Sequence, residues 1–205
     1  MSTPQYGIDA LHFALPRLSL PIAALAEARG IEADKLRFGL GLESMAVCDI
    51  DEDVVTLGAE AAWNLLQRAG VKPEELGRIY LGTESSVDAA KPSAAYIHGL
   101  IEQRWATEHG PRSLAHCDAL DMTFACIGGV DALQNSLDWV RAGQGRKALV
   151  IASDVAKYAP GSPGEYTQGA GAVAMLVTES PRILVLDTDF TVAVESVSDF
   201  FKPRR

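Results

Sequence analysis

The chain has 205 residues, and its 48% of hydrophobic and 22% of charged residues favour a well-packed globular domain, or one half of a larger enzyme, over a disordered segment. The net charge of −9 argues against nucleic acid or an anionic membrane as a partner, because both are negatively charged themselves. No apolar run approaches the roughly 20 residues of a membrane-spanning helix, and three cysteines without a pairing pattern predict a reducing, cytoplasmic setting.

Strand and helix patterns alternate along the first third of the chain. A strand is expected over 6–15, and Ser19 is expected to cap a helix that runs to about Gly30. Asp53 is expected to open a second helix over 54–69, because apolar residues recur there at helical spacing.

The remaining elements continue this alternation and end in strands. The run KALVIA at 147–152 is typical of a strand that is buried on both faces of a sheet. Helices are expected over 92–109 and 128–143, a loop over 154–168, and strands over 78–83, 114–120, 147–152, 170–178, 182–187 and 191–197. This order predicts an α/β fold with a mainly parallel mixed sheet and helices on both faces, the last strands being antiparallel in part.

Cys126 is the first candidate for chemistry. It lies in 121–129 (DMTFACIGG), where an apolar strand gives way to a helix. A free cysteine is more often a buried structural residue, and this is the interpretation for Cys48 and Cys117. At a helix start, however, the dipole favours the thiolate, N–H groups can hold an oxyanion, and the following glycines let the backbone approach closely. Cys126 is therefore a candidate nucleophile.

Glu84 is the second candidate, and it ends a strand pattern in 82–85 (GTES). A solvated carboxylate in a turn is the commoner role for such a residue. Ligands of parallel sheets gather, however, at the carboxyl ends of the strands, where a carboxylate can act as a general base. A thiol at a helix start and a carboxylate at a strand end make an acyl-transfer pair, in which one holds the acyl group while the other moves a proton.

No metal or dinucleotide site is predicted. The run GAG at 169–171 precedes a strand rather than a helix, so it indicates a tight turn and not a dinucleotide-binding loop. The four histidines have no metal-ligand spacing with one another or with the cysteines. Each is expected as a surface or packing residue: His12, His98, His109 and His116.

Together the motifs resemble those of the 3-hydroxy-3-methylglutaryl-CoA synthase family, of the thiolase superfamily, along the whole chain. Each motif alone is weakly specific, but six in the family's order and spacing are strongly specific. After GID at 7–9 they are 39–47 (GLGLESMAV), 82–88 (GTESSVD), 125–129 (ACIGG), 153–158 (SDVAKY), 167–175 (TQGAGAVAM) and 199–203 (DFFKP). The resemblance implies the N-terminal half of a thiolase-like fold, with residues 1–205 as a single unit.

The resemblance also implies a reaction. Cys126 would take the acetyl group of acetyl-CoA as a thioester, and Glu84 would remove a methyl proton. The carbanion would attack the ketone of a 3-oxoacyl thioester such as acetoacetyl-CoA, and water would release the product. Acetyl-CoA is then a substrate, and no separate cofactor is implied. The matched motifs imply these substrate-binding residues: Gly128, Gly129, Tyr158, Thr167 and Gly169.

The chain departs from the family pattern beside the nucleophile and at its end. Thr123-Phe124, Ile127 and Val130 stand where the family usually has Lys-Glu, Tyr and Thr, which makes the wall beside Cys126 more apolar and leaves the acceptor open. Family members are much longer, and their second half carries a histidine that polarises the ketone. The resemblance therefore implies a C-terminal partner, as a separate subunit or as the other fragment of a nicked or truncated protein, and a homodimer of such pairs.

Two other interpretations stay open. A β-branching synthase of polyketide biosynthesis shares the cysteine and glutamate chemistry, but takes its acyl groups from an acyl carrier protein. A catalytically inactive scaffold subunit would use the same fold to stabilise a partner. Ketoacyl synthases and thiolases are disfavoured, because they depend on histidines where this chain has Glu84.

Overall fold

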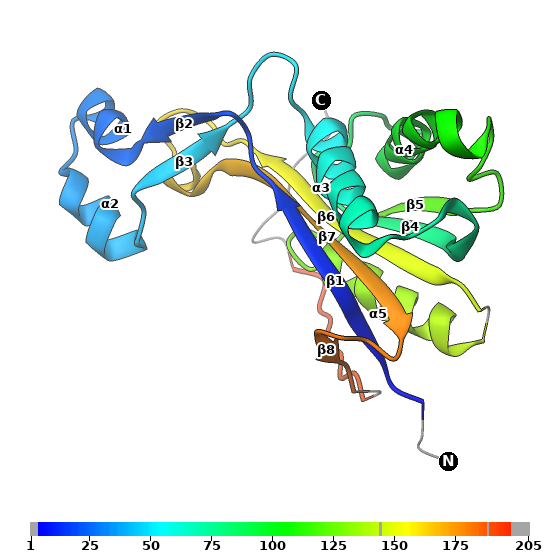
Figure 1. Ribbon diagram of the computed structural model, residues 1–205. Helices are drawn as coiled ribbons and strands as arrows, with labels where there is room; N and C mark the ends of the chain where they lie inside the picture. Colours follow the sequence, from blue (N-terminus) through cyan, green and yellow to red (C-terminus); the bar gives the residue numbers. More distant parts are fainter. Residues whose placement is uncertain (1–3, 144, 188, 198–205) are drawn as a thin grey trace.

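The computed structural model describes residues 4–143, 145–187 and 189–197. A six-stranded sheet forms the centre, with α3 and α4 on one face and α5 on the other, and a small arm of α1, α2, β2 and β3 projects from one end (Figure 1). The elements are β1 Tyr6–Ala14, β2 Leu18–Pro21, α1 Ile22–Arg29, α2 Ala33–Leu40, β3 Ser44–Val47, α3 Val54–Ala69, β4 Leu76–Gly82, α4 Ser93–His109, β5 Asp118–Met122, α5 Gly128–Arg141, β6 Lys147–Ala156, β7 Gly169–Glu179 and β8 Leu184–Val185, with 3-10 turns at Pro73–Glu75 and Pro163–Thr167.

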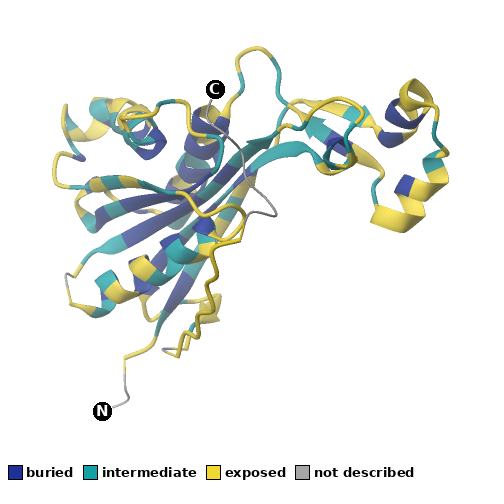
Figure 2. Ribbon diagram, turned by 180° about the vertical axis from the view of Figure 1, so that it is seen from behind, coloured by how far each residue is buried: buried dark blue, intermediate teal, exposed yellow. Residues whose placement is uncertain are grey.

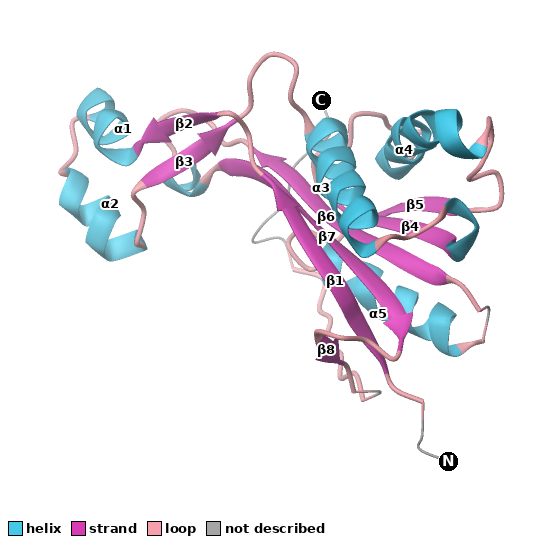
Figure 3. Ribbon diagram, in the orientation of Figure 1, coloured by secondary structure: helices cyan, strands magenta, loops and turns pink. Residues whose placement is uncertain are grey.

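The sheet has the strand order β5-β4-β6-β7-β1-β8. It is mixed and carries helices on both faces, as expected (Figure 3), but its parallel share is smaller than the sequence indicated. In the described part, β4 pairs in parallel with β5 and β6, whereas the β6–β7, β7–β1 and β1–β8 pairs are antiparallel. The reason is connectivity: α4 and α5 provide the crossovers that parallel strands need, and no long helix separates β6 from β7.

Alternate residues of β6 divide the core between the two faces. Leu149 and Ile151 are fully buried in the cluster under α3 and α4, while Ala148 and Val150 are fully buried in the cluster under α5. In Figure 2 the buried colour predominates along the central strands. The apolar run at 147–152 therefore forms the doubly covered strand that its composition predicts.

The arm was not foreseen from the sequence. Leu18–Pro21 is a strand that pairs with Ser44–Val47, so Ser19 lies within β2 and does not cap a helix; α1 begins at Ile22, after Pro21. The expectation of a helix from Ser19 was wrong because the pairing joins segments that lie far apart in the chain. Apolar residues of the arm form a cluster of their own around Ile22, Leu25 and Met45.

Two strand expectations later in the chain also need correction. Leu114 belongs to a turn, and β5 begins only at Asp118. The Leu114 backbone bonds to side chains of α4 instead of a strand, since its N–H donates to Glu102 Oε1 (3.0 Å) and its carbonyl contacts His98 Nε2 (2.9 Å). Residues 191–197 form no strand, and the matched segment 199–203 lies outside the described residues.

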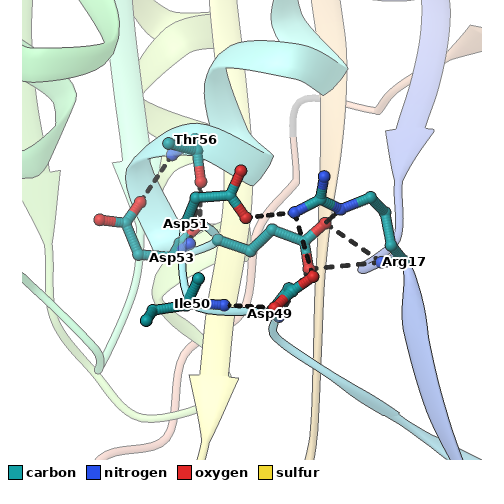
Figure 4. Close-up of polar contacts among 7 residues, drawn as sticks. Arg17, Asp49, Ile50, Asp51, Asp53 and Thr56 are labelled. Atoms are coloured by element: carbon teal, nitrogen blue, oxygen red, sulfur yellow. Dashed lines mark hydrogen bonds and ion pairs between the residues drawn. The ribbon is translucent and has the colours of Figure 1, made fainter.

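The entry to α3 is held by polar contacts (Figure 4). Asp53 Oδ1 accepts hydrogen bonds from the N–H groups of Val55 (2.9 Å) and Thr56 (2.8 Å), and the Asp53 N–H donates to Thr56 Oγ1 (2.8 Å). This is a capping box, which confirms Asp53 as the start of the helix. Arg17, just after β1, pairs with Asp49 and Asp51 of the loop that precedes α3. In the described part, no helix is both long and apolar enough to cross a membrane.

Candidate active site

The carboxyl ends of β4 and β5 meet at one edge of the sheet, and each leads into a candidate residue. Gly82 ends β4 opposite Met122, which ends β5. The pairing continues one residue further, because the Thr83 N–H donates to the Met122 carbonyl oxygen (3.2 Å). Glu84 therefore leaves the sheet beside the strand that leads to Cys126, as the rule for parallel strands predicts.

Three glycines bring the start of α5 against this edge. A Cβ on Gly82 would lie 2.3 Å from the Gly129 nitrogen, and one on Gly128 would lie 2.7 Å from the Met122 carbonyl oxygen. A Cβ on Gly129 would meet the Ala152 side chain of β6 at 3.1 Å. Only glycine permits such backbone contact. Gly128 and Gly129 thus fix the helix start, and with it Cys126, beside the segment that carries Glu84.

Cys126 is exposed and stands in a tight turn just before α5. The Ile127 N–H donates to the Phe124 carbonyl oxygen (3.0 Å), and Ala125 between them has φ of 42°. A non-glycine residue rarely adopts a positive φ, and such strain is concentrated at functional sites. Cys126 thus stands two positions before α5, at the end of the helix where the dipole is positive.

The other two cysteines have a different environment. Burial raises the pKa of the Cys117 thiol to about 12, and burial also raises the pKa of Cys48. Both groups therefore stay protonated and unreactive near neutral pH. This agrees with the interpretation of Cys48 and Cys117 as structural residues.

Asp154 organises the turn that carries Glu84. Its Oδ1 accepts hydrogen bonds from Thr83 Oγ1 (3.0 Å), the Glu84 N–H (2.9 Å) and Ser85 Oγ (2.8 Å). The sequence placed Asp154 in a matched motif but indicated no role for it. What could have indicated a role is the position of Asp154 in the matched motif 153–158, directly after the apolar run of β6. One carboxylate oxygen with three donors holds the Glu84 backbone in one conformation.

Asp121 connects the segments that carry the two candidate residues, from the other side. It lies in β5, five positions before Cys126, and its Oδ2 accepts hydrogen bonds from Ser86 Oγ (3.1 Å) and the Ser93 N–H (2.7 Å). Its Oδ1 accepts from the Ala94 N–H (2.8 Å). Asp121 thereby caps α4 from a neighbouring strand, which no local sequence pattern could reveal.

The remaining implied substrate residues lie at a second place. Tyr158 and Gly169 line a pocket of about 270 Å³ between β3 and the adjoining ends of β6 and β7, together with Cys48 and Gln168. Cys126 and Glu84 are not among its lining residues. Thr167 is exposed, and its Oγ1 donates to the Gly164 carbonyl oxygen (2.9 Å). The structure thus groups Gly128 and Gly129 with Cys126 and Glu84, and groups Tyr158 with Gly169.

Two of the histidines lie in α4. His98 contacts the Leu114 carbonyl oxygen, and His109 packs edge-on against Trp105, which agrees with packing roles. Across residues 4–143, 145–187 and 189–197, no cluster of three or more His, Cys, Asp or Glu side chains could hold a metal ion.

The close approach at Gly82 leads to a stability prediction. Gly82→Ala would place its methyl group 2.3 Å from the Gly129 backbone nitrogen, and backbone atoms cannot move aside as a flexible side chain can. We expect a loss of about 1–3 kcal/mol, seen as a fall of several degrees in Tm. The matched control is Gly99→Ala in α4, where nothing lies within 4 Å of the new Cβ; its Tm should be unchanged or slightly higher. Equal Tm values for the two variants would contradict the close contact.

Comparison with known proteins agrees with this geometry. Residues 3–181 match the family model described as hydroxymethylglutaryl-coenzyme A synthase N terminal. The chain is 41% identical to the hydroxymethylglutaryl-CoA synthase of Haloferax volcanii over 202 residues, which is 97% of this chain and 44% of that protein.

Two solved structures are similar to the chain. One is a HMG-CoA synthase complexed with CoA, at 37% identity and a TM-score of 0.87, covering 97% of this chain and 48% of that one. The other is the HMG synthase of the curacin biosynthetic pathway in complex with an acetyl donor-ACP, at 28% identity and a TM-score of 0.78, covering 90% and 43%. The chain therefore spans less than half the length of the proteins that it matches.

Proposed function

Because the chain belongs to the hydroxymethylglutaryl-coenzyme A synthase family, we propose that it supplies the nucleophile and the general base of an acyl-condensing transferase. Cys126 Sγ attacks the carbonyl carbon of acetyl-CoA, the CoA thiol leaves, and an acetyl thioester remains on the enzyme. Glu84 takes a proton from the acetyl methyl group, and the resulting carbanion adds to the ketone of a 3-oxoacyl thioester. Water then hydrolyses the thioester bond and frees Cys126.

The observation that carries this proposal is the junction of the two segments. Gly82 of β4 lies against the backbone of Gly128 and Gly129 at the start of α5, so that Glu84 and Cys126 each stand two positions from a common contact. A thioester acidifies its α-carbon, and a carboxylate held beside that carbon gains from proximity what it lacks in basicity. N–H groups at the start of α5 would stabilise the oxyanion that forms at the thioester carbonyl.

An exposed apolar face supports the proposal that a C-terminal half completes the enzyme. Leu11, Phe13 and Leu15 are 49%, 58% and 62% exposed and alternate along β1 and its continuation, while Ala10 and Ala14 pack under α3. The exposed residues therefore face the α5 side of the sheet. Phe124, Ile127 and Val130 around the nucleophile are also 43–50% exposed. An apolar surface of this kind marks an interaction site.

We propose that this half, a separate chain or the other part of a longer protein, covers the face and supplies the histidine that polarises the ketone. The pair would then form a homodimer. The acceptor would enter between the two halves, beside the apolar side chains of Phe124, Ile127 and Val130.

The apolar face gives a prediction about self-association. Without the second half, the chain should elute from size-exclusion chromatography as aggregates or oligomers, because Leu11 and Phe13 are left in water. The double change Leu11→Ser/Phe13→Ser should shift elution towards the monomer. Phe38→Ser is the matched control, since Phe38 is 82% exposed but lies on α2 of the arm; its elution should match the parent. A parent chain that is monomeric at micromolar concentration would contradict the prediction.

The proposed function is tested by mass spectrometry. The chain is incubated with acetyl-CoA, with and without the C-terminal half of a hydroxymethylglutaryl-CoA synthase, and digested. We expect an acetyl group on the peptide that contains Cys126, and more of it when the second half is present. No acetylation in either case would overturn the proposal and would favour a scaffold subunit.

A second candidate function differs in how the acyl group arrives. The similarity to a synthase solved with an acetyl donor-ACP favours a β-branching enzyme that acts on carrier-protein thioesters. The same mass-spectrometric assay separates the two: faster labelling of Cys126 by acetyl-ACP than by acetyl-CoA would support the carrier-protein route. The higher identity to the synthase complexed with CoA supports acetyl-CoA as the donor that we propose first.

A further inference from the structure

The segment between β6 and β7, which carries Tyr158 and Thr167, is fastened to the arm by one ion pair. Glu165 is only 4% exposed. The Arg29 guanidinium at the end of α1 donates from Nε to Glu165 Oε2 (2.8 Å) and from Nη2 to Oε1 (2.5 Å). The Gly161 N–H donates a third hydrogen bond to Oε2 (2.7 Å). Such a two-point contact fixes orientation as well as distance.

The charges of this pair are strongly coupled. Hydrogen bonding from Arg29 lowers the pKa of Glu165 to about 2, and Glu165 raises the pKa of Arg29. Because the carboxyl pKa is depressed from 4.5, the contribution of the pair to stability is complete above that pH and is lost only as the pH falls towards 2. The pair is therefore intact over the whole neutral range. A buried carboxylate without Arg29 would be left uncompensated.

Smaller contacts extend the link from the ion pair to the pocket. Tyr166 packs on the apolar cluster of the arm. Gln168 Nε2 contacts Met45 Sδ of β3 at 3.7 Å, and its Oε1 accepts from the Tyr158 N–H at 3.4 Å. A Cβ on Gly164 would lie 2.8 Å from the Tyr158 ring, so the turn that contains Glu165 rests on that ring. Movement of the turn would thus move Tyr158 and Thr167 together.

We propose that Arg29 is a positioning residue for the acyl thioester: through Glu165 it holds Tyr158 and Thr167 in the binding conformation and sets the distance between the arm and the ends of β6 and β7. The proposal rests on the proposed function, since Tyr158 and Thr167 act on substrate only if the chain does. Arg29 itself needs no contact with the substrate. The arm, which has no part in the Cys126–Glu84 edge, then serves as the support of the substrate segment.

The test measures the rate of Cys126 acetylation against acetyl-CoA concentration, with the C-terminal half present. Arg29→Gln should raise KM by roughly 10-fold, because misplaced binding residues weaken binding of the thioester and do not alter the chemical step. The limiting rate should therefore stay within about 2-fold of the parent's. Arg29→Lys keeps the charge but not the two-point geometry, so its KM should lie between those of the parent and of Arg29→Gln. Hydrogen exchange should rise in 157–168 and not at the β4–α5 edge.

Arg37→Gln is the matched control, because Arg37 of α2 pairs with Glu43 within the same arm and both side chains are largely exposed. Its KM and its exchange should equal those of the parent. Faster exchange in Arg29→Gln with an unchanged KM would reduce the pair to a structural contact and overturn the inference. Absence of acetylation in the parent itself would overturn the proposed function, and the inference with it.

Discussion

Cys126→Ser is expected to abolish formation of the acyl-enzyme while leaving the fold intact. A serine hydroxyl is far less acidic than a thiol, so the helix dipole cannot generate a useful nucleophile from it, and the acetylation rate should fall on the order of 10³-fold or more. Cys126 is exposed, and the change removes no buried contact. The Tm should therefore stay within a degree or two of the parent's, while mass spectrometry should find no acetyl group at position 126.

The matched controls are the two other cysteines. Cys48→Ser and Cys117→Ser should keep acetylation at the parent stoichiometry, because both thiols lie in environments that raise their pKa. Cys117→Ser should lower the Tm slightly, because it puts a hydroxyl in a partly buried position. Full acetylation of the Cys126→Ser variant would show that the nucleophile lies elsewhere.

Glu84→Gln is expected to separate the two halves of the reaction. The amide keeps the size of the carboxylate but cannot take a proton, and the Glu84 N–H bond to Asp154 (2.9 Å) does not depend on the side chain. Acetylation of Cys126 should therefore continue, while condensation with a 3-oxoacyl thioester should fall by about 10²–10⁴-fold, the usual contribution of a general base.

Two measurements check this separation. Acetyl transfer is read from the mass of the Cys126 peptide, and proton removal is read from exchange of the acetyl methyl protons with deuterated solvent, which should be lost together with condensation. Glu60→Gln, an exposed carboxylate on α3, should change neither. Equal loss of acetylation and condensation in Glu84→Gln would indicate that Glu84 shapes the site and does not act as its base.

The role proposed for Glu84 explains why its segment makes so many hydrogen bonds. Asp154 holds Thr83, Glu84 and Ser85 through one oxygen, while Asp121 holds Ser86 from the opposite side. A general base is effective only when it stays within reach of the proton that it removes. Two carboxylates from neighbouring strands therefore restrain the segment on both sides of the proposed base.

The sequence by itself determined the elements whose patterns are local. The helical spacing over 54–69 and the Asp53 cap predict α3, and the apolar run at 147–152 predicts the doubly buried β6. It also placed Glu84 at the end of a strand and Cys126 where a strand gives way to a helix, and ligands of parallel sheets gather at such strand ends. These inferences succeed because each depends on residues within a few positions of one another, or on a rule that holds for every parallel sheet.

Only the tertiary structure decided the contacts between distant segments. The β2–β3 pairing, the α4 cap from Asp121 and the Asp154 bonds to the Glu84 turn join residues that share no local pattern, and the Arg29–Glu165 pair spans 136 positions. The positive φ of Ala125 is likewise imposed from outside, since alanine has no preference for it. Such features depend on how the whole chain packs, because the interactions that stabilise them join residues that come together only in the folded chain.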